Sequence, residues 1–236
     1  MAKHFSHKKA IIIIGPPGSG KGTQAQLTAQ HYDAIHFDMG RYLEGLFYSE
    51  EKSKNDPQLQ KEKKNFETGE LVSPPFVLNV LQQKILNYSN ANVSVIFSGN
   101  PRTVYETIGD DKTPGVCNVL EAAYGKEHVV VFHFIVAGQT SVERNSTRKI
   151  CSVCATPLLG ILKLDLAQCP FCGGILRTRT LDKPDVIEER LREYEKQTLP
   201  VIGEIQKRGY AVHQIDAAPM PFEVFASIQS VLDAQI

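Results

Sequence analysis

The stretch from Ala10 to Thr23, which reads AIIIIGPPGSGKGT, constrains the fold of this chain more than any other segment. The run of isoleucines after Ala10 suits a strand that is buried on both faces of a parallel sheet. It leads directly into a glycine-rich turn, and a helix-compatible segment from Gln24 to His31 follows. The sequence therefore predicts a buried strand, a tight loop and a helix in immediate succession.

The loop contains the pattern Gly15-x-x-x-x-Gly20-Lys21. Glycines allow the backbone to bend so that successive N–H groups point at one anion, and the following helix directs the positive end of its dipole to the same place. A lysine at this position can contact the outer phosphates of a nucleotide. A plain glycine-rich turn would fit the letters alone, but the flanking strand and helix favour a phosphate-binding loop. The predicted phosphate-binding residues are Gly15, Gly18, Ser19, Gly20, Lys21, Gly22 and Thr23.

The overall charge gives no indication of a nucleic acid or an acidic membrane as the main partner, because 26 basic and 26 acidic side chains cancel over 236 residues. No window approaches the roughly 20 apolar residues that span a bilayer. The apolar run after Lys8 and Lys9 is too short for a signal peptide, since it ends in the phosphate loop. We therefore expect a cytoplasmic protein whose five cysteines are reduced or metal-bound rather than joined in disulfides.

Strands and helices alternate along the rest of the chain. Apolar, β-branched runs predict strands at residues 34–37, 93–97, 129–136 and 211–215, and helices are expected at 40–48, from 74 to about 85, through 142, at 184–208 and at 221–232. Ser73 and Pro74 are typical of a helix cap and a first-turn proline, and Asp182 is the expected cap of the long helix. The alternation predicts an α/β fold of three layers, with ligands at the carboxyl ends of parallel strands.

Two segments interrupt this alternation. Residues 49–70 are highly charged and hold few large apolar side chains, which is typical of short exposed helices that cover a site. Residues 150–180 carry two Cys-x-x-Cys pairs, and fourteen residues separate the pairs, whose members are Cys151, Cys154, Cys169 and Cys172.

Two such pairs provide four thiolates for one tetrahedral Zn²⁺ ion, which we favour over a disulfide or four unrelated core cysteines. A site closed by four sulfurs leaves no position for water, so its role should be structural. Zinc ribbons also bind nucleic acids, but no basic run lies between these pairs, which makes that use the less favoured one. The remaining cysteine, Cys117, is expected to be a small buried apolar residue.

With these parts in place, the chain resembles the adenylate kinase family of nucleoside monophosphate kinases over nearly its whole length. The resemblance rests on GPPGSGKGTQ at 15–24, TGELVSP at 68–74, PRT at 101–103, the pair Arg144 and Arg148, the cysteine segment, and RTLDKPDVIEERLREY at 179–194. It implies one P-loop kinase domain over 1–236, with a monophosphate-binding flap at 38–80 and a zinc-binding lid at 148–180. It also implies a monomer.

The resemblance further implies reversible transfer of the γ-phosphoryl group of Mg·ATP to AMP, which gives two ADP. Such a transfer depends on charge neutralisation and in-line positioning more than on an acid or a base, so a lysine and several arginines are the expected equipment. The family motifs assign the phosphates to Lys21, Arg102, Arg144, Arg148, Arg179 and Arg190. They assign the monophosphate site to Met39, Gly40, Arg41, Gly69, Val72, Gly99, Arg102 and Glu106.

The segment after the second expected strand departs from the family pattern. The family carries Ser-Thr-Gly-Asp-x-x-Arg there, whereas this chain reads DMGRYLE at 38–44. Glu44 thus replaces the arginine that binds the monophosphate. Arg41 lies three residues earlier on the same helical face, and we expect it to bind that phosphate instead.

Two further departures concern magnesium and the base. Ser98 replaces the family aspartate that orients water around Mg²⁺, which predicts retained but slower turnover, with Asp38 acting through water. Glu106 replaces a glutamine that faces the adenine edge. Because an ionised glutamate only accepts hydrogen bonds, GMP, which offers two adjacent donors, is an alternative acceptor. A structural role for Glu106 is equally open, and a nucleotide-binding regulatory protein with weakened catalysis is the third possibility.

Overall fold

The computed structural model describes residues 3–49, 56–154, 156–158, 166–178 and 180–235. They form a parallel sheet of five strands in the order β2-β3-β1-β4-β8. The strands are β1 (Ala10–Ile14), β2 (Ile35–Asp38), β3 (Val95–Ser98), β4 (Val129–Ile135) and β8 (Val212–Asp216). The isoleucine strand lies at the centre, as its sequence predicts, and the α/β class with a parallel sheet is confirmed.

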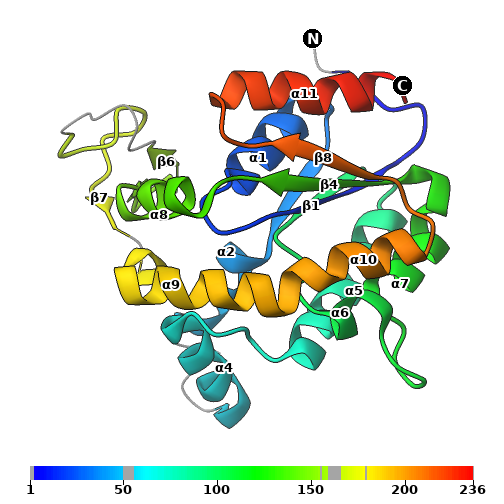
Figure 1. Ribbon diagram of the computed structural model, residues 1–236, viewed down its shortest axis with the longest axis horizontal. Coiled ribbons are helices and arrows are strands. Elements are labelled where there is room, and N and C mark those ends of the chain that lie inside the picture. The colour runs from blue at the N-terminus through cyan, green and yellow to red at the C-terminus, as the bar shows by residue number, and fades with distance from the viewer. Residues whose placement is uncertain (1–2, 50–55, 155, 159–165, 179, 236) are drawn as a thin grey trace.

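The side chains of β1 alternate between two cores, because successive residues of a strand point to opposite faces. Ile11 and Ile13 pack with the cluster that α1 and α11 cover, whereas Ile12 and Ile14 belong to the larger cluster on the opposite face. In Figure 1, α1 and α11 lie on one side of the sheet and α5, α7 and α10 on the other. The molecule therefore has three layers.

The helices of the two outer layers follow the expected alternation. They are α1 (Lys21–His31) and α11 (Pro221–Asp233) on one side, and α5 (Pro74–Asn90), α7 (Val116–Tyr124) and α10 (Leu199–Lys207) on the other. Cys117 on α7 is buried, as expected, and burial raises the pKa of its thiol to about 11. Among the helices that the structure describes, none is long and apolar enough to cross a membrane.

Most of the remaining elements lie near the carboxyl edge of the sheet. They are α2 (Met39–Phe47), α4 (Pro57–Thr68), α6 (Val104–Ile108), α8 (Gly138–Ser146), η3 (Thr180–Asp182), α9 (Pro184–Glu193) and a π-helical turn, η4 (Tyr194–Thr198). The short helix η1 (Lys126–His128) directly precedes β4 and so lies at the amino edge. The π-helical turn interrupts the single helix expected over 184–208. Helices α6 and α7 were not predicted, and α6 is too short for a periodic pattern.

The helix start expected at Ser73 and Pro74 is confirmed, whereas the cap expected at Asp182 is wrong. Ser73 is the N-cap of α5, but its hydroxyl donates to Glu62 rather than accepting from the helix. Lys183, not Asp182, precedes α9, and the Asp182 carboxylate binds arginines instead. In each case the side chain bonds to a residue outside the helix that follows it, and not to the backbone N–H groups at the start of that helix.

The cysteine segment forms a second, smaller sheet beside the core (Figure 1). Its described strands are β5 (Lys149–Cys151), β6 (Pro157–Leu158) and β7 (Leu176–Arg177), which pair antiparallel in the order β6-β5-β7. Short antiparallel strands joined by cysteine-bearing turns fit the expected ribbon.

Candidate active site

A cavity of about 670 Å³ opens at the carboxyl edge of the parallel sheet. The ends of β1, β2 and β3 form its floor, and the lid residues Pro157 and Leu158 contribute to its opposite wall. Ligands of open α/β sheets bind at this edge, where the loops that follow neighbouring strands meet. The topology thus gathers the predicted phosphate loop, the flap and the lid around one space.

The phosphate loop lines this cavity with all of its predicted residues. Gly20 precedes α1 in the left-handed conformation and provides no side-chain cap, so the first N–H groups of the helix remain available for an anion. Gly18 has φ +80°, and a Cβ atom there would lie 2.6 Å from the carbonyl oxygen of Ser141. The loop therefore packs directly on α8, where Ser141 donates to Pro17.

Lys21 lies at the centre of a group of cations. Its Nζ atom donates to the carbonyl oxygens of Gly15 and Pro16, both at 2.7 Å. Burial holds the pKa of Lys21 well below its usual range, and the neighbouring Arg102, Arg190 and Arg148 lower it further while Asp38 opposes them. A bound anion would offset this surplus of positive charge.

Two of the expected arginines share one buried carboxylate. Arg148 Nε and Nη2 donate to Asp182 at 2.9 and 2.5 Å, and Arg190 Nη1 lies 3.7 Å from the same group. The Asp182 side chain is fully buried. A bidentate, charge-assisted pair fixes the planes of the guanidinium groups, so Asp182 positions Arg148 and Arg190 toward the cavity that both line.

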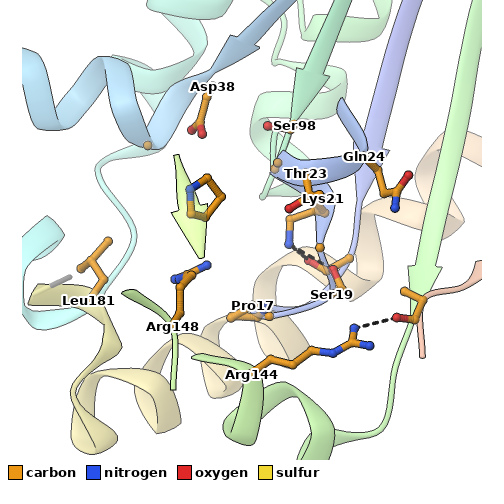
Figure 2. A pocket seen from close by; sticks show the side chains of 18 of the residues that line it. Pro17, Ser19, Lys21, Thr23, Gln24, Asp38, Ser98, Arg144, Arg148 and Leu181 are labelled. Atoms are coloured by element: carbon orange, nitrogen blue, oxygen red, sulfur yellow. Dashed lines mark hydrogen bonds between the residues drawn. The ribbon is translucent and has the colours of Figure 1, made fainter. Parts of the chain in front are cut away.

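The other arginines lie in different surroundings. Arg102 lines the cavity, and its Nε donates to the carbonyl of Gly99 at 2.8 Å. Arg144 also lines the cavity, but its two terminal nitrogens donate to Ala217 and Ala218, both at 2.7 Å, as Figure 2 shows in part. Arg144 is therefore bonded to the loop after β8. Its position in the sequence did not predict this contact. Arg179 lies outside the described residues.

The predicted monophosphate residues divide between two adjoining cavities. Arg41, Gly69 and Gly99 line the large one, and Met39, Val72 and Glu106 line a second of about 40 Å³. Gly40 and Arg102 border both. Gly99 lies against Lys21 and Arg102, and its φ of +81° is a backbone conformation that favours glycine.

Glu44 contacts the lid. Its carboxylate lies 3.2 Å from Arg177 Nη2 on β7. This ion pair joins α2 to the small sheet, across the mouth of the site. Because an exposed pair of this kind contributes only about 0–1 kcal/mol, it guides the relative placement of flap and lid more than it stabilises the protein.

His36 is a site residue that the sequence reasoning missed. Its Nε2 lies 2.8 Å from Ser98 Oγ, and both line the large cavity with Asp38. Burial lowers the pKa of His36; Asp38 raises it and Arg41 lowers it. The spacing of His36 and Asp38, two residues apart on a strand, indicates one face, but the contact with Ser98 depends on the pairing of β2 with β3. Figure 2 shows Asp38, Ser98 and Lys21 around the same space.

The π-helical turn η4 supplies further residues to the cavity. Tyr194 and Thr198 line it, and Tyr194 lies 3.0 Å from His133 Nε2 on β4. Turns of this kind are frequent at functional sites. A regular helical pattern through this segment gives no signal that these two side chains would face the site.

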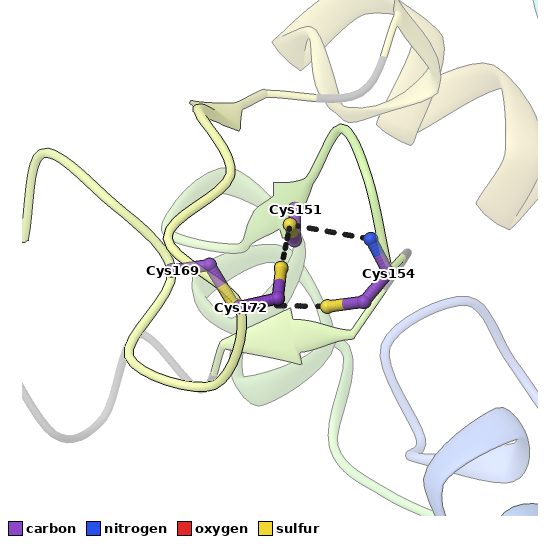
Figure 3. Close-up of side chains that lie close together, drawn as sticks. All are labelled: Cys151, Cys154, Cys169 and Cys172. Carbon is purple, nitrogen blue, oxygen red and sulfur yellow. Dashed lines mark hydrogen bonds between the residues drawn. The ribbon is translucent and has the colours of Figure 1, made fainter.

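The four lid cysteines converge on one point (Figure 3). Their sulfur atoms all lie within 4.8 Å of one another, with Cys151 and Cys172 at 3.4 Å and Cys154 and Cys169 at 3.7 Å. Sulfurs at about 2.3 Å from a tetrahedral zinc ion are about 3.8 Å apart, whereas a disulfide bond is about 2.05 Å long. The described thiols therefore fit a metal ion and not a disulfide.

Comparisons with known proteins agree with this arrangement. The family model described as "Adenylate kinase" matches residues 13–210. An adenylate kinase of Chlamydia caviae is 32% identical over 223 residues, which cover 94% of this chain and 97% of the relative. Those of Methanothrix thermoacetophila and Borrelia duttonii are 31% and 29% identical, each covering 94% of this chain and 97% and 96% of the relative. The chain therefore belongs to the adenylate kinase family.

Proposed function

We propose that this protein reversibly transfers the γ-phosphoryl group of Mg·ATP to AMP and so forms two ADP. The observation that carries the proposal is the cluster of Lys21, Arg102, Arg148 and Arg190 around one cavity, with a second, smaller cavity beside it. The two spaces adjoin at Arg102, so nucleotides that approach from either side would bring their phosphates together among these cations. The relatives named adenylate kinase support the same reaction.

The cations supply the catalysis in this proposal. The N-terminus of α1 and Lys21 bind the β- and γ-phosphates of ATP, while Arg102, Arg148 and Arg190 stabilise the charge on the group in transfer. Asp182 acts on them as a positioning residue, because it fixes two of the three guanidinium groups. The flap at 38–80 encloses the acceptor, and the lid at 148–180 excludes water, which would otherwise accept the phosphoryl group.

Both expected metals fit the residues present. Thr23, Asp38 and Ser98 line the cavity with oxygen atoms, which suit the water ligands of a Mg²⁺ ion. When bound with ATP, Mg²⁺ neutralises charge on the phosphates. The four lid thiolates fit a structural Zn²⁺, which leaves no open coordination position and takes no part in the transfer.

A coupled assay with ATP and each monophosphate in turn tests the reaction. Turnover with AMP is the expected result. Preferred turnover with GMP is the second candidate, and the buried Glu106 carboxyl group beside the small cavity favours it. Binding of ATP without turnover of any monophosphate would instead identify a regulatory nucleotide-binding protein.

Replacing Arg41 with alanine is expected to raise the KM for AMP roughly 10–100-fold, because a hydrogen bond to a charged group contributes about 1.5–3 kcal/mol. Arg41 lines the large cavity, whereas Glu44 is engaged with Arg177. Steady-state kinetics at saturating ATP measure the effect. Arg192→Ala, on the exposed side of α9 beside Glu189, is the matched control. An unchanged KM in Arg41→Ala would refute this role for Arg41.

Replacing Ser98 with aspartate is expected to raise kcat about tenfold and to lower the Mg²⁺ concentration needed for half-maximal rate. The new carboxylate would hold metal-bound water more strongly than the hydroxyl does, and His36 lies 2.8 Å away to orient it. A magnesium titration of the rate measures both effects. Ser98→Ala, which removes the contact with His36, should show no gain. Equal rates and equal Mg²⁺ dependence in Ser98→Asp and the native protein would argue against a weakened magnesium site.

A further inference from the structure

The small cavity beside Arg102 is lined by both apolar and polar side chains. Met39, Leu43, Phe66, Val72 and Val77 are the apolar ones, and Glu70, Asn100, Arg102 and Glu106 are the polar ones. Its volume is about 40 Å³, so a base would enter it only if the lining moved apart. An apolar lining with a few hydrogen-bonding groups is suited to a heterocycle.

Two of these polar side chains, Asn100 and Glu106, carry acceptor oxygens. Asn100 is 3% exposed, and its Oδ1 atom has no hydrogen-bond partner among the described residues. Its amide nitrogen donates instead to Glu106 Oε2 at 3.2 Å. An unpartnered buried acceptor carries a free-energy cost that a ligand donor would remove. This part of the cavity therefore selects for an amino group.

The Glu106 carboxyl group is held by several donors. Oε2 accepts from Arg102 N at 2.7 Å and from Asn100 Nδ2 at 3.2 Å, and the Thr103 side chain also lies within bonding range of the carboxyl group. Because Oε2 is fixed as an acceptor by two donors, Oε1 is the atom that changes when the group gains or loses a proton.

Burial and the neighbouring donors act on the Glu106 carboxyl group in opposite directions. Glu106 is 1% exposed, and this burial raises its pKa, while Arg102, Asn100 and Thr103 act in the opposite direction. Glu70 lines the same cavity. The helices that pack on α6, which are α5, α7 and α10, contribute buried aliphatic side chains such as Leu81, Leu120 and Ile202 to this region.

Building on the proposed acceptor site, we propose that Glu106 selects the base through its own proton. As a neutral acid, Oε1–H donates to N1 of adenine while Asn100 Oδ1 accepts from the N6 amino group. As a carboxylate, Oε1 and Asn100 Oδ1 form two adjacent acceptors, which match the N1–H and N2 amino donors of guanine and oppose the lone pair of adenine N1. The protonation state of one buried side chain therefore decides between AMP and GMP.

The coupling between binding of the base and binding of a proton to Glu106 has a definite sign. AMP binds the protonated form, so it raises the pKa of Glu106 in the complex and takes up a proton. Affinity for AMP is then constant below the pKa of free Glu106 and falls by up to about tenfold per pH unit above it. GMP binds the ionised form, and its affinity falls as the pH decreases through that pKa.

Calorimetry of the full, metal-loaded protein at a series of pH values tests this proposal. Titrations of AMP in buffers with different ionisation enthalpies should show proton uptake, whereas GMP should show none or release. The analogue 1-deaza-AMP, which lacks the N1 acceptor, should bind more weakly and without uptake. In Glu106→Gln, AMP should bind without uptake and independently of pH, and GMP at least about tenfold more weakly. Glu70→Gln, which alters the other carboxylate of the cavity, should keep the uptake.

Proton-independent binding of AMP by the native protein would overturn the inference, as would retained uptake in Glu106→Gln. If Glu106→Gln fails to fold, the comparison of AMP with 1-deaza-AMP on the native protein decides the matter alone. The two proposals fail separately: AMP that binds with proton uptake but is never phosphorylated overturns the proposed reaction, and AMP that is phosphorylated without uptake overturns the role of Glu106.

Discussion

Lys21→Met is expected to reduce kcat by about 10²–10³-fold, the usual effect of removing one preorganised donor from a charged transition state. Burial and then the neighbouring Arg102, Arg190 and Arg148 lower the pKa of Lys21, which is the first residue of α1 and lines the cavity. Methionine keeps the length and apolar stem of the side chain but removes its charge. Steady-state and single-turnover rates with ATP and AMP measure the loss.

The fold should survive this substitution, because the loss of the two bonds to Gly15 and Pro16 is opposed by the removal of a charge that is crowded by like charges. Thermal unfolding of Lys21→Met should therefore remain a single transition close to the native temperature. Lys112→Met, at an exposed position after α6, is a control that should leave both rate and stability unchanged. A Lys21→Met protein that turns over at the native rate would remove Lys21 from the proposed chemistry.

Removal of the lid metal is expected to have the second large effect. The lid has little core of its own, since Val153, Phe171 and Ile175 are 73%, 73% and 69% exposed. In small metal sites the free energy of metal binding supplies most of the folding free energy. Treatment with a chelator should therefore unfold the lid, expose it to proteolysis between residues 151 and 172, and lower kcat/KM at least about tenfold by admitting water.

Metal analysis and limited proteolysis, with and without chelator, measure these changes. Cys154→Ser should lose the metal, whereas Cys117→Ser, which alters a buried thiol of α7 in the core, should retain it. Native protein that is purified without bound metal and is indifferent to chelation would contradict the zinc assignment.

The fold was predictable where its signals are local. The isoleucine strand has the expected bounds, Ala10 to Ile14. These could be predicted because a parallel strand that is buried on both faces consists of one continuous apolar run. The start of α5 at Ser73 and Pro74 was also predictable. The hydrogen-bond partners of Ser73 and Asp182 were not, since these side chains bond to Glu62 and Arg148, which lie outside the helices that follow them. In the folded chain these side chains form hydrogen bonds with other elements instead of local bonds to the nearby backbone.

The same distinction applies to the site. The phosphate loop and the cysteine pairs are contiguous motifs, and the structure brings each set together at one place. The contact of His36 with Ser98 depends on strand pairing, and the bonds of Arg144 depend on the path of the chain after β8. Residue identity can propose such side chains, but only the assembled fold shows their partners.

Transfer of labelled phosphate tests the central claim most directly. With ATP labelled in the γ-phosphate and unlabelled AMP, the account predicts that label appears in ADP, in equal amounts with unlabelled ADP derived from ATP, and that this transfer disappears in Lys21→Met. Label that is released as inorganic phosphate, or that remains in ATP with AMP and with every other monophosphate, would contradict a nucleoside monophosphate kinase.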